Sequence, residues 1–307
     1  MSGIISSVDK RLVLASGRAY PQLAQDVADN LGLELVPTTG YDFAFGVIYF
    51  RFNESVRGAD VFLLQSMTAP INKWLMEQLI MIDAAKRASA KRITVVAPFY
   101  PYARQDKKHQ GREPVSARLV ADLYATAGAD RLMSVDLHAA QSQGFFDGPV
   151  DHLWAMPVLV EHVRKNTDLS RVAVVSPDAG RIRVAEKWSA KLGNCPLAFV
   201  HKTRDTTKPN VAVANRVVGD VDGRDCILVD DLIDTGGTIA EAVRVLYKAG
   251  ARSVKVAATH GVLSDPAPER LAGCGATEVI VTDTLPIPEE KRFPTLTVLP
   301  IAPLLSR

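Results

Sequence analysis

The sequence is poor in cysteine and has no long hydrophobic run. Its three cysteines, Cys195, Cys226 and Cys274, are odd in number and far apart, so neither a disulfide framework nor a cysteine-ligated metal site is expected. No stretch approaches the roughly 18 apolar residues that a membrane-spanning helix needs. The first residues also lack the charged flank and apolar core of a secretory signal. We therefore expect a cytoplasmic protein that does not bind a membrane.

An excess of charge of one sign is also missing. Lysine and arginine number 36 against 34 aspartates and glutamates, which gives a net charge of +2. Because so neutral a chain has no overall field to attract nucleic acid, we expect no nucleic-acid partner and only local basic sites. With 47% hydrophobic and 23% charged residues the composition is that of a globular protein, and 307 residues favour two domains.

Short apolar runs alternate with stretches of helical periodicity along most of the chain. Strands are predicted at 11–15, 61–65, 93–98, 132–136, 172–175, 197–200, 227–229, 254–258, 279–281 and 296–299, with a hairpin at 41–52. Helices are predicted to end at Leu31 and Leu192 and to span 72–90, 116–127 and 239–249. This alternation is typical of an α/β fold, in which helices flank both faces of a mainly parallel sheet.

Two segments of the chain repeat the same landmarks. Ala127-Gly-Ala129 is followed by a predicted strand and His138, and Ala249-Gly-Ala251 is followed by a predicted strand and His260. Both landmarks shift by 122 positions (249 − 127 and 260 − 138). The repeat favours two copies of one α/β domain, which we place at residues 1–150 and 151–307.

The stretch 226–238 carries the clearest functional signal. A buried strand is followed by two acids, then by a Thr-Gly-Gly-Thr turn, and then by a helix. Backbone N–H groups at the glycines, the threonine hydroxyls and the helix N-terminus would bind a phosphate, and the acids would accept hydrogen bonds from sugar hydroxyls. We therefore expect a pentose 5-phosphate here. The candidate binding residues are Asp230, Asp231, Asp234, Thr235, Gly236, Gly237 and Thr238.

Single parts of this run have simpler explanations. An Asp-Asp pair is often a helix N-cap and turn, and Gly-Gly is often a plain loop. The order of strand, acids, glycines and helix is what favours the phosphate site. The run resembles the phosphoribosyl pyrophosphate (PRPP) binding signature of the type I phosphoribosyltransferase fold. It predicts ribose 5-phosphate or PRPP as ligand without fixing the reaction.

Three other residues at predicted strand ends are candidate metal ligands. Asp136 and His138 are two positions apart, so their side chains would point the same way from an extended chain, and Asp178 follows another strand. Such a sparse set suits Mg²⁺, which keeps several waters and takes few protein ligands beside phosphate oxygens. A lone histidine at a strand end is more often structural, and only the nearby basic segments favour the metal interpretation.

Two basic segments are candidates for gripping a polyphosphate. Arg104, Gln105 and Asp106 lie in an aromatic and then basic loop that could hold a nucleoside triphosphate, with a plain solvated loop as an equal alternative. Lys202 and Arg204 precede a threonine-rich stretch. They predict a mobile flap that brings two cations to a phosphoryl group in transfer.

Six runs are distinctive when taken together. They are Glu54–Gly58, Pro101–Lys108, Val135–His138, Gln143–Asp147, Val175–Asp178 and Val229–Thr238. In this order they resemble the ribose-phosphate pyrophosphokinase (PRPP synthetase) family, bacterial class I type, whose members continue beyond the position of Arg307 with a further helix. The resemblance implies two tandem type I phosphoribosyltransferase-like domains, with ATP on the N-terminal side and ribose 5-phosphate on the C-terminal side. It also implies Mg²⁺ as cofactor and a homo-oligomer, commonly a hexamer whose ATP sites a neighbouring subunit completes.

The resemblance also implies roles for single residues. In that family ATP and ribose 5-phosphate give PRPP and AMP, and by position Lys202 is the catalytic lysine and Arg204 the flap arginine. The other matches are Arg104 and Gln105 to ATP contacts, His138 and Asp178 to Mg²⁺-associated residues, and Asp230 with Asp234–Thr238 to the ribose-phosphate site.

The adenine-binding motif departs from the family pattern. The family has Phe-x-Asn/Asp-Gly-Glu at this point, and this chain has Phe-Ala-Phe-Gly-Val over 43–47. Phe43 and Gly46 keep the stacking ring and the tight turn, whereas Phe45 and Val47 replace a polar and an acidic group that recognise adenine. Because stacking reads no base identity, we expect weaker ATP binding or a weaker preference for adenine.

Two alternatives to a diphosphokinase remain. A non-catalytic relative that binds nucleotide within an assembly would explain the altered motif, but not the retained Lys202, Arg204 and His138. A phosphoribosyltransferase that consumes PRPP would share the Gly-Gly run, but it gives no reason for the loop at Arg104 and Gln105 or for a duplicated domain.

Overall fold

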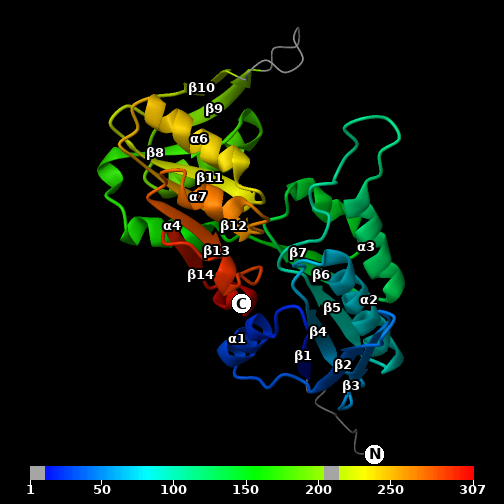
Figure 1. Ribbon diagram of the computed structural model, residues 1–307. Helices are drawn as coiled ribbons and strands as arrows, with labels where there is room; N and C mark the ends of the chain where they lie inside the picture. The colour runs from blue at the N-terminus through cyan, green and yellow to red at the C-terminus, as the bar shows by residue number, and fades with distance from the viewer. Residues whose placement is uncertain (1–10, 204–213) are drawn as a thin grey trace, which may run out of the picture. The chain divides into compact units, whose positions relative to one another are not determined.

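The structure, a computed structural model, describes residues 11–203 and 214–307. The chain divides into two compact units; in Figure 1 the first is blue to green with the red C-terminal end, and the second runs from green to red. The first runs to Leu153 and includes Ala302–Arg307, and the second is Trp154–Ile301. Each unit is built on its own mainly parallel sheet with flanking helices, which confirms the predicted α/β class. In the described part of the chain, no helix combines the length and apolarity that crossing a membrane requires.

The first unit contains a five-stranded sheet in the order β1-β4-β5-β6-β7. The strands are β1 (Leu12–Ser16), β4 (Asp60–Leu64), β5 (Arg92–Val96), β6 (Arg131–Val135) and β7 (Val150–Leu153). All neighbours are parallel. Their carboxyl ends therefore meet at one edge of the sheet, where the loops that follow β1, β4, β5 and β6 lie.

Helices cover both faces of this sheet. They are α1 (Pro21–Leu31), α2 (Ile71–Arg87), α3 (Ser116–Ala127), α8 (Ala302–Leu305) and the 3₁₀ turn η1 (Ala140–Phe145). Helices α2 and α3 enclose the main core, while α1 and α8 pack together over the other face beside β1 (Figure 1). In the core the hydroxyl of the fully buried Tyr124 donates to Gln78, 2.7 Å away. The Gln78 amide donates in turn to backbone carbonyls of β4 and β5, so these buried polar groups are paired.

The predicted hairpin forms a separate two-stranded sheet. Its strands, β2 (Thr38–Asp42) and β3 (Ile48–Phe52), pair antiparallel, and β3 packs against α2. Residues 43–47, which carry the altered adenine motif, make the turn between them. This hairpin prediction is confirmed.

The second unit contains a seven-stranded sheet in the order β10-β9-β8-β11-β12-β13-β14. The strands are β8 (Val172–Ser176), β9 (Leu197–Thr203), β10 (Ala214–Val218), β11 (Asp225–Ile233), β12 (Ser253–Gly261), β13 (Glu278–Thr282) and β14 (Leu296–Leu299). All neighbours are parallel except β10, which pairs antiparallel with β9 at the edge.

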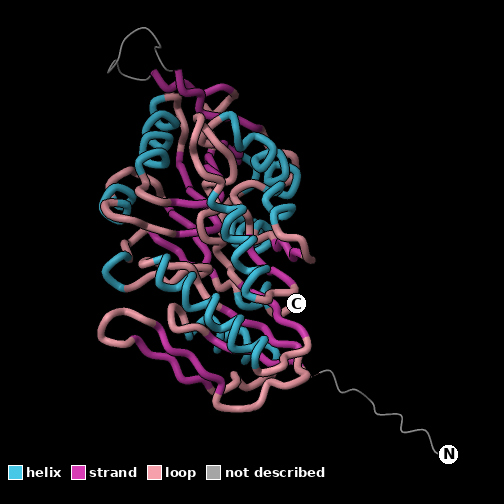
Figure 2. The backbone as a smooth tube through the Cα atoms, turned by 90° about the vertical axis from the view of Figure 1, so that its right-hand side faces the viewer, coloured by secondary structure: helices cyan, strands magenta, loops and turns pink. Residues whose placement is uncertain are grey.

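Helices lie on both sides of this second sheet (Figure 2). They are α4 (Met156–Lys165), α5 (Ile182–Lys191), α6 (Gly237–Lys248) and α7 (Ala267–Ala272), with 3₁₀ turns η2 (Leu169–Arg171), η3 (Ala179–Arg181) and η4 (Glu289–Lys291). Helix α4 contacts α5, and α6 contacts α7. In the sheet, β9 lies on one side of β8 and β11 lies on the other, so the order of the strands reverses direction at β8. Such a change of direction marks the usual ligand-binding crevice of an open α/β sheet.

Candidate functional site

The loop between β11 and α6 forms the predicted phosphate cradle. Gly236 has a left-handed backbone (φ 72°) and is the N-cap of α6, where no side chain caps the helix. Among the described residues, no backbone hydrogen bond occupies the N–H groups of Thr235, Gly236, Gly237 or Thr238. The helix N-terminus adds partial positive charge at the same point. These donors are therefore available to an anion.

The two glycines of the cradle differ in how much room their surroundings would leave for a side chain. A Cβ on Gly236 would lie 3.3 Å from Leu271 and 3.4 Å from Ala267 on α7, in addition to its positive φ. A Cβ on Gly237 would meet only the tip of Arg270, 3.7 Å away. That arginine donates from Nη1 to the carbonyl of Thr235 at 3.1 Å. Arg270, which the sequence did not single out, thus helps to hold the loop in shape.

The paired acids lie inside strand β11 and not beyond it. Our prediction ended the strand at residue 229, but the ladder to β12 continues to Ile233 and Gly261, so the apolar run understates the strand. The N–H of Asp231 donates to Oδ1 of Asp230 at 2.8 Å, and both carboxylates are largely buried. Burial and the neighbouring charge of Asp231 raise the pKa of Asp230 well above its usual value.

Arg181 is the cation that faces these acids. Its Nη2 lies 2.8 Å from Oδ2 of Asp231, and its Nε lies 3.8 Å from Oδ1 of Asp230. It follows β8, which is paired with β11, so the two strand ends bring the residues together. Asp178, a predicted metal ligand, caps the same turn by accepting the N–H of Gly180 at 2.8 Å. The distinctive run Val175–Asp178 ends three positions before this arginine, so the sequence did not single it out.

The predicted catalytic pair lies at the end of strand β9. Lys202 is within β9, where its backbone pairs with Asn215 of β10. Its side chain and the whole of Arg204, with the predicted flap, lie outside the described part of the chain. The roles of both residues stay predictions.

The predicted ATP loop and metal loop both lie at the carboxyl edge of the first sheet. Arg104 and Gln105 are exposed and Asp106 is half-buried in the loop after β5. The neighbouring strand β6 is followed by Asp136 and His138, both half-buried. Among the described residues, no group of three or more histidine, cysteine or carboxylate side chains forms a ready-made metal site. These residues supply two potential ligands to a partly hydrated ion, in keeping with Mg²⁺.

The metal loop is held in an uncommon conformation. Asp136 has a positive φ of 39° and donates its N–H to the carbonyl of Leu153 at 2.9 Å. The next N–H, of Leu137, donates to Nε2 of His152 at 3.0 Å. An imidazole that accepts at Nε2 is neutral and carries its proton on Nδ1. A non-glycine residue at positive φ costs free energy, and such strain is often found at functional sites.

The tip of the hairpin presents the altered adenine motif to solvent. Gly46 has φ 91° and donates to the carbonyl of Phe43 at 2.8 Å, which confirms the tight turn. The rings of Phe43 and Phe45 are 6.2 Å apart and inclined by 23°. Phe43, Phe45 and Val47 are 43%, 81% and 48% exposed. The tip therefore offers aromatic faces and no charged side chain.

Known proteins resemble this chain over nearly its whole length. Residues 12–128 match the model of the N-terminal domain of ribose phosphate pyrophosphokinase, and residues 190–305 match the phosphoribosyl synthetase-associated domain. A ribose-phosphate pyrophosphokinase of Bifidobacterium longum is 70% identical over 300 residues, which is 97% of this chain and 88% of that protein. The chain belongs to the ribose-phosphate pyrophosphokinase family.

Other members of the pyrophosphokinase family give the same picture. The protein from Corynebacterium glutamicum is 67% identical over 298 residues, covering 97% of this chain and 91% of the relative. The crystal structure of phosphoribosylpyrophosphate synthetase from Mycobacterium smegmatis is 64% identical, covers 97% of both chains and superposes with a TM-score of 0.93. The predicted family is confirmed, and the chain is an enzyme of the ribose-phosphate pyrophosphokinase family.

Proposed function

We propose that this enzyme transfers the β,γ-diphosphoryl group of ATP to the C1 hydroxyl of ribose 5-phosphate, which gives PRPP and AMP. The observation that carries the proposal is the open cradle after β11, with two largely buried carboxylates directly upstream. Such a site matches an acceptor that has a phosphate at one end and a diol in the middle. The family name of the 64–70% identical relatives supports the same reaction.

The acceptor would be held by groups of two kinds. The 5-phosphate would accept hydrogen bonds from the N–H groups of Thr235 to Thr238, and Asp234 would flank that loop. The ring hydroxyls would donate to Asp230 and Asp231. Since Arg181 balances part of the charge of both acids, the site can bind a sugar phosphate without excessive repulsion.

Mg²⁺ and ATP are assigned by residue type and position. Asp136 and His138 of the first unit, and separately Asp178 of the second, are the residues that we assign to Mg²⁺, which would neutralise charge on the phosphate oxygens of ATP when bound. Fixed carboxylate and imidazole groups at strand ends fit a hydrated ion that needs few protein ligands. We assign ATP to residues 1–150 and ribose 5-phosphate to 151–307.

The remaining candidate residues would bind the nucleotide and neutralise the negative charge of the diphosphoryl group in transfer. Phosphoryl transfer depends on positioning and neutralisation more than on a covalent intermediate. Phe43, Phe45, Gly46 and Val47 would form the adenine side of the site. Arg104 and Gln105 would donate to the phosphates, with Asp106 as a further nucleotide-binding residue beside them, and Lys202 and Arg204 would neutralise the diphosphoryl group in transfer. The homo-oligomer, a hexamer by resemblance, and a cytoplasmic location stay predictions.

A coupled assay of AMP release tests the proposed reaction. With ATP, Mg²⁺ and ribose 5-phosphate the protein should release AMP, and Lys202→Ala should lower kcat by about 10²–10³-fold, as expected when one transition-state contact is lost. Arg87→Ala, which removes an exposed arginine paired only locally with Asp83, is a matched control and should keep its rate. AMP release from the wild type that does not require ribose 5-phosphate would contradict the proposal.

The non-catalytic alternative has weaker support. It draws on Phe45 and Val47 alone, whereas the cradle, the acids and the relatives' names all favour an enzyme. It predicts nucleotide binding without AMP release under any substrate condition.

A further inference from the structure

Arg18, in the loop after β1, is fixed to the body of the first unit. Its backbone N–H and its Nε donate to the two carboxylate oxygens of Glu77 on α2, at 2.7 and 2.6 Å. Nε2 of Gln65 adds a third hydrogen bond to that carboxylate at 2.9 Å. Glu77 is completely buried, and a buried carboxylate requires partners of this kind. The guanidinium therefore has a well-defined position.

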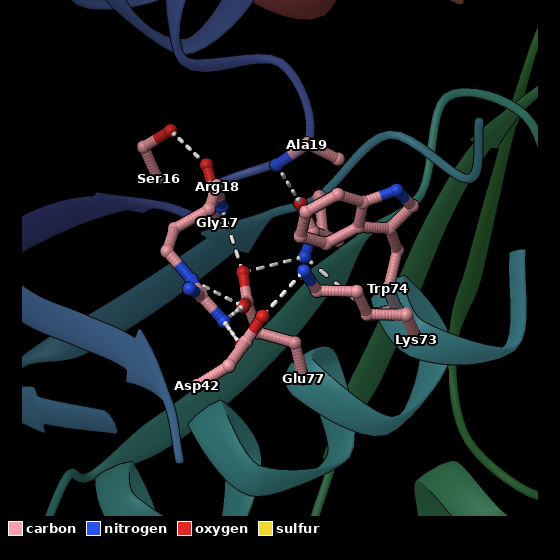
Figure 3. Close-up of polar contacts among 9 residues, drawn as sticks. Ser16, Gly17, Arg18, Ala19, Asp42, Lys73, Trp74 and Glu77 are labelled. Carbon is pink, nitrogen blue, oxygen red and sulfur yellow. Dashed lines mark hydrogen bonds and ion pairs between the residues drawn. The ribbon is translucent and has the colours of Figure 1, made fainter. Parts of the chain in front are cut away.

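The same guanidinium also reaches the hairpin (Figure 3). Its Nη2 lies 2.6 Å from Oδ1 of Asp42, the last residue of β2. Lys73 of α2 places Nζ 2.6 Å from Oδ2 of that aspartate. A Cβ on Gly40 would lie 3.1 Å from Cδ of Arg18, so the arginine crosses close to the strand. Two cations from different elements thus hold one carboxylate of the hairpin.

Asp42 directly precedes the tip that we assign to adenine. The N–H of Phe43 donates to the carbonyl of Val47, and the N–H of Gly46 donates to the carbonyl of Phe43, each at 2.8 Å. The tip is therefore one closed turn whose position follows that of Asp42. Within the described parts of the chain the two hairpin strands pair only with each other, so no neighbouring strand there supports the tip.

We propose that Arg18, Asp42 and Lys73 are positioning residues for the nucleotide, because they fix the hairpin so that Phe43 faces the adenine ring. This inference rests on the proposed function, which places ATP at this tip. Hydrogen bonds from Lys73 and Arg18 hold the pKa of Asp42 below its ordinary value, so the carboxylate is charged at neutral pH. Solvent reaches all three side chains, and exposed pairs of this kind stabilise folding little. Breaking the network should therefore affect ATP binding more than stability.

Calorimetric titration of the full chain with ATP tests this proposal without relying on turnover. Asp42→Asn and Lys73→Gln should each raise the Kd for ATP by about 2–5-fold, the range that one partly exposed ion pair supplies. Asp42→Glu, which keeps the charge, should recover most of the affinity. Asp83→Asn removes the Asp83–Arg87 ion pair within α2, which includes no hairpin residue, and should bind ATP as the wild type does.

Two further readouts separate positioning from a general structural role. Asp42→Asn should raise KM for ATP while kcat and KM for ribose 5-phosphate stay unchanged, and amide hydrogen exchange at Phe43 and Gly46 should become faster. Unchanged ATP affinity in both Asp42→Asn and Lys73→Gln would overturn the proposal, as would a wild type that does not bind ATP. Failure of the proposed reaction would look different, because ATP would bind and respond to these variants without any release of AMP.

Discussion

Phe45 is the residue on which the prediction of a weakened adenine preference depends most. It is 81% exposed, and its ring lies nearly parallel to that of Phe43. A side chain that makes so little contact with its own protein contributes little to stability. Phe45 should therefore affect the binding of a ligand at the hairpin tip more than the stability of the protein. Val47, 48% exposed at the other end of the turn, offers no hydrogen bond to a base.

The nucleotide preference of the enzyme should reflect this loss of polar groups. Base stacking supplies about 1–3 kcal/mol without reading identity, whereas a site with specific hydrogen bonds can discriminate by about 10⁴–10⁵-fold. We predict that kcat/KM for ATP and GTP differ by less than about tenfold, and that Phe45→Asn with Val47→Glu raises kcat/KM for ATP selectively.

Initial rates with ATP, GTP and CTP measure this preference. Leu119→Asn is a matched control, because it makes an exposed apolar residue of α3 polar far along the chain from the hairpin. It should leave the ratio of rates unchanged. A strong preference for ATP in the wild type, with an ordinary KM, would refute the prediction.

At the scale of the element, β11 carries two aspartates with opposite pKa shifts. Burial and the charge of Asp231 raise the pKa of Asp230, whereas a hydrogen bond from Arg252 lowers the pKa of Asp225. A carboxyl whose folded pKa is raised costs stability above its unfolded pKa of about 3.9. A carboxyl whose folded pKa is lowered adds stability above its unfolded pKa, and that added stability is lost as the pH falls through the folded pKa. At neutral pH, Asp230 therefore destabilises the end of β11 that precedes the phosphate cradle.

The two aspartates should respond oppositely to neutralisation. Without ligand, Asp230→Asn should raise Tm at pH 7 by about 1–2 °C, and Asp225→Asn should lower it by a similar amount, as about 1 kcal/mol gives in a chain of 307 residues. Both differences should shrink as the pH is lowered towards 3. Thermal denaturation between pH 3 and 8 checks this, and a lower Tm for Asp230→Asn at pH 7 would contradict it. That variant should also lose affinity for ribose 5-phosphate.

The sequence predicts elements well where a single pattern decides them. Buried parallel strands such as β5 and β8 are short apolar runs, and the hairpin turn is marked by Gly46. Strand β7, with the half-polar sequence Val-Asp-His-Leu, and the edge strand β10 gave no such run and were missed. Helix α4 was also missed, although the spacing of its buried residues at 159, 160 and 163 was a readable signal.

The candidate site shows a similar limit. The phosphate cradle is local in sequence, so the run of glycines and threonines predicts it. Arg270 holds the cradle loop from 35 residues away (270 − 235), and Arg181 pairs with the upstream acids from 49 residues away (230 − 181). In the first unit Arg18 reaches Glu77 across 59 residues. Contacts of this kind depend on which strands are neighbours, and no periodicity in the sequence encodes that. The strand order supplies the missing information.

At the scale of the whole molecule, each of the two α/β units is expected to bind one of the two substrates. The helix-to-strand corners at Gly128 and Gly250 lie at matching places, after α3 and before β6 in one unit and after α6 and before β12 in the other. The polar loops of both units follow the carboxyl ends of parallel strands. We infer that the second unit holds the sugar phosphate and the first holds the nucleotide.

The location of ribose 5-phosphate is the most direct test of this account. A crystal structure of the protein with that ligand should show phosphate oxygens within about 3 Å of the backbone nitrogens of Thr235 to Thr238, with ring hydroxyls on Asp230 or Asp231. A sugar phosphate bound at any other place, with those four N–H groups left to water, would contradict it.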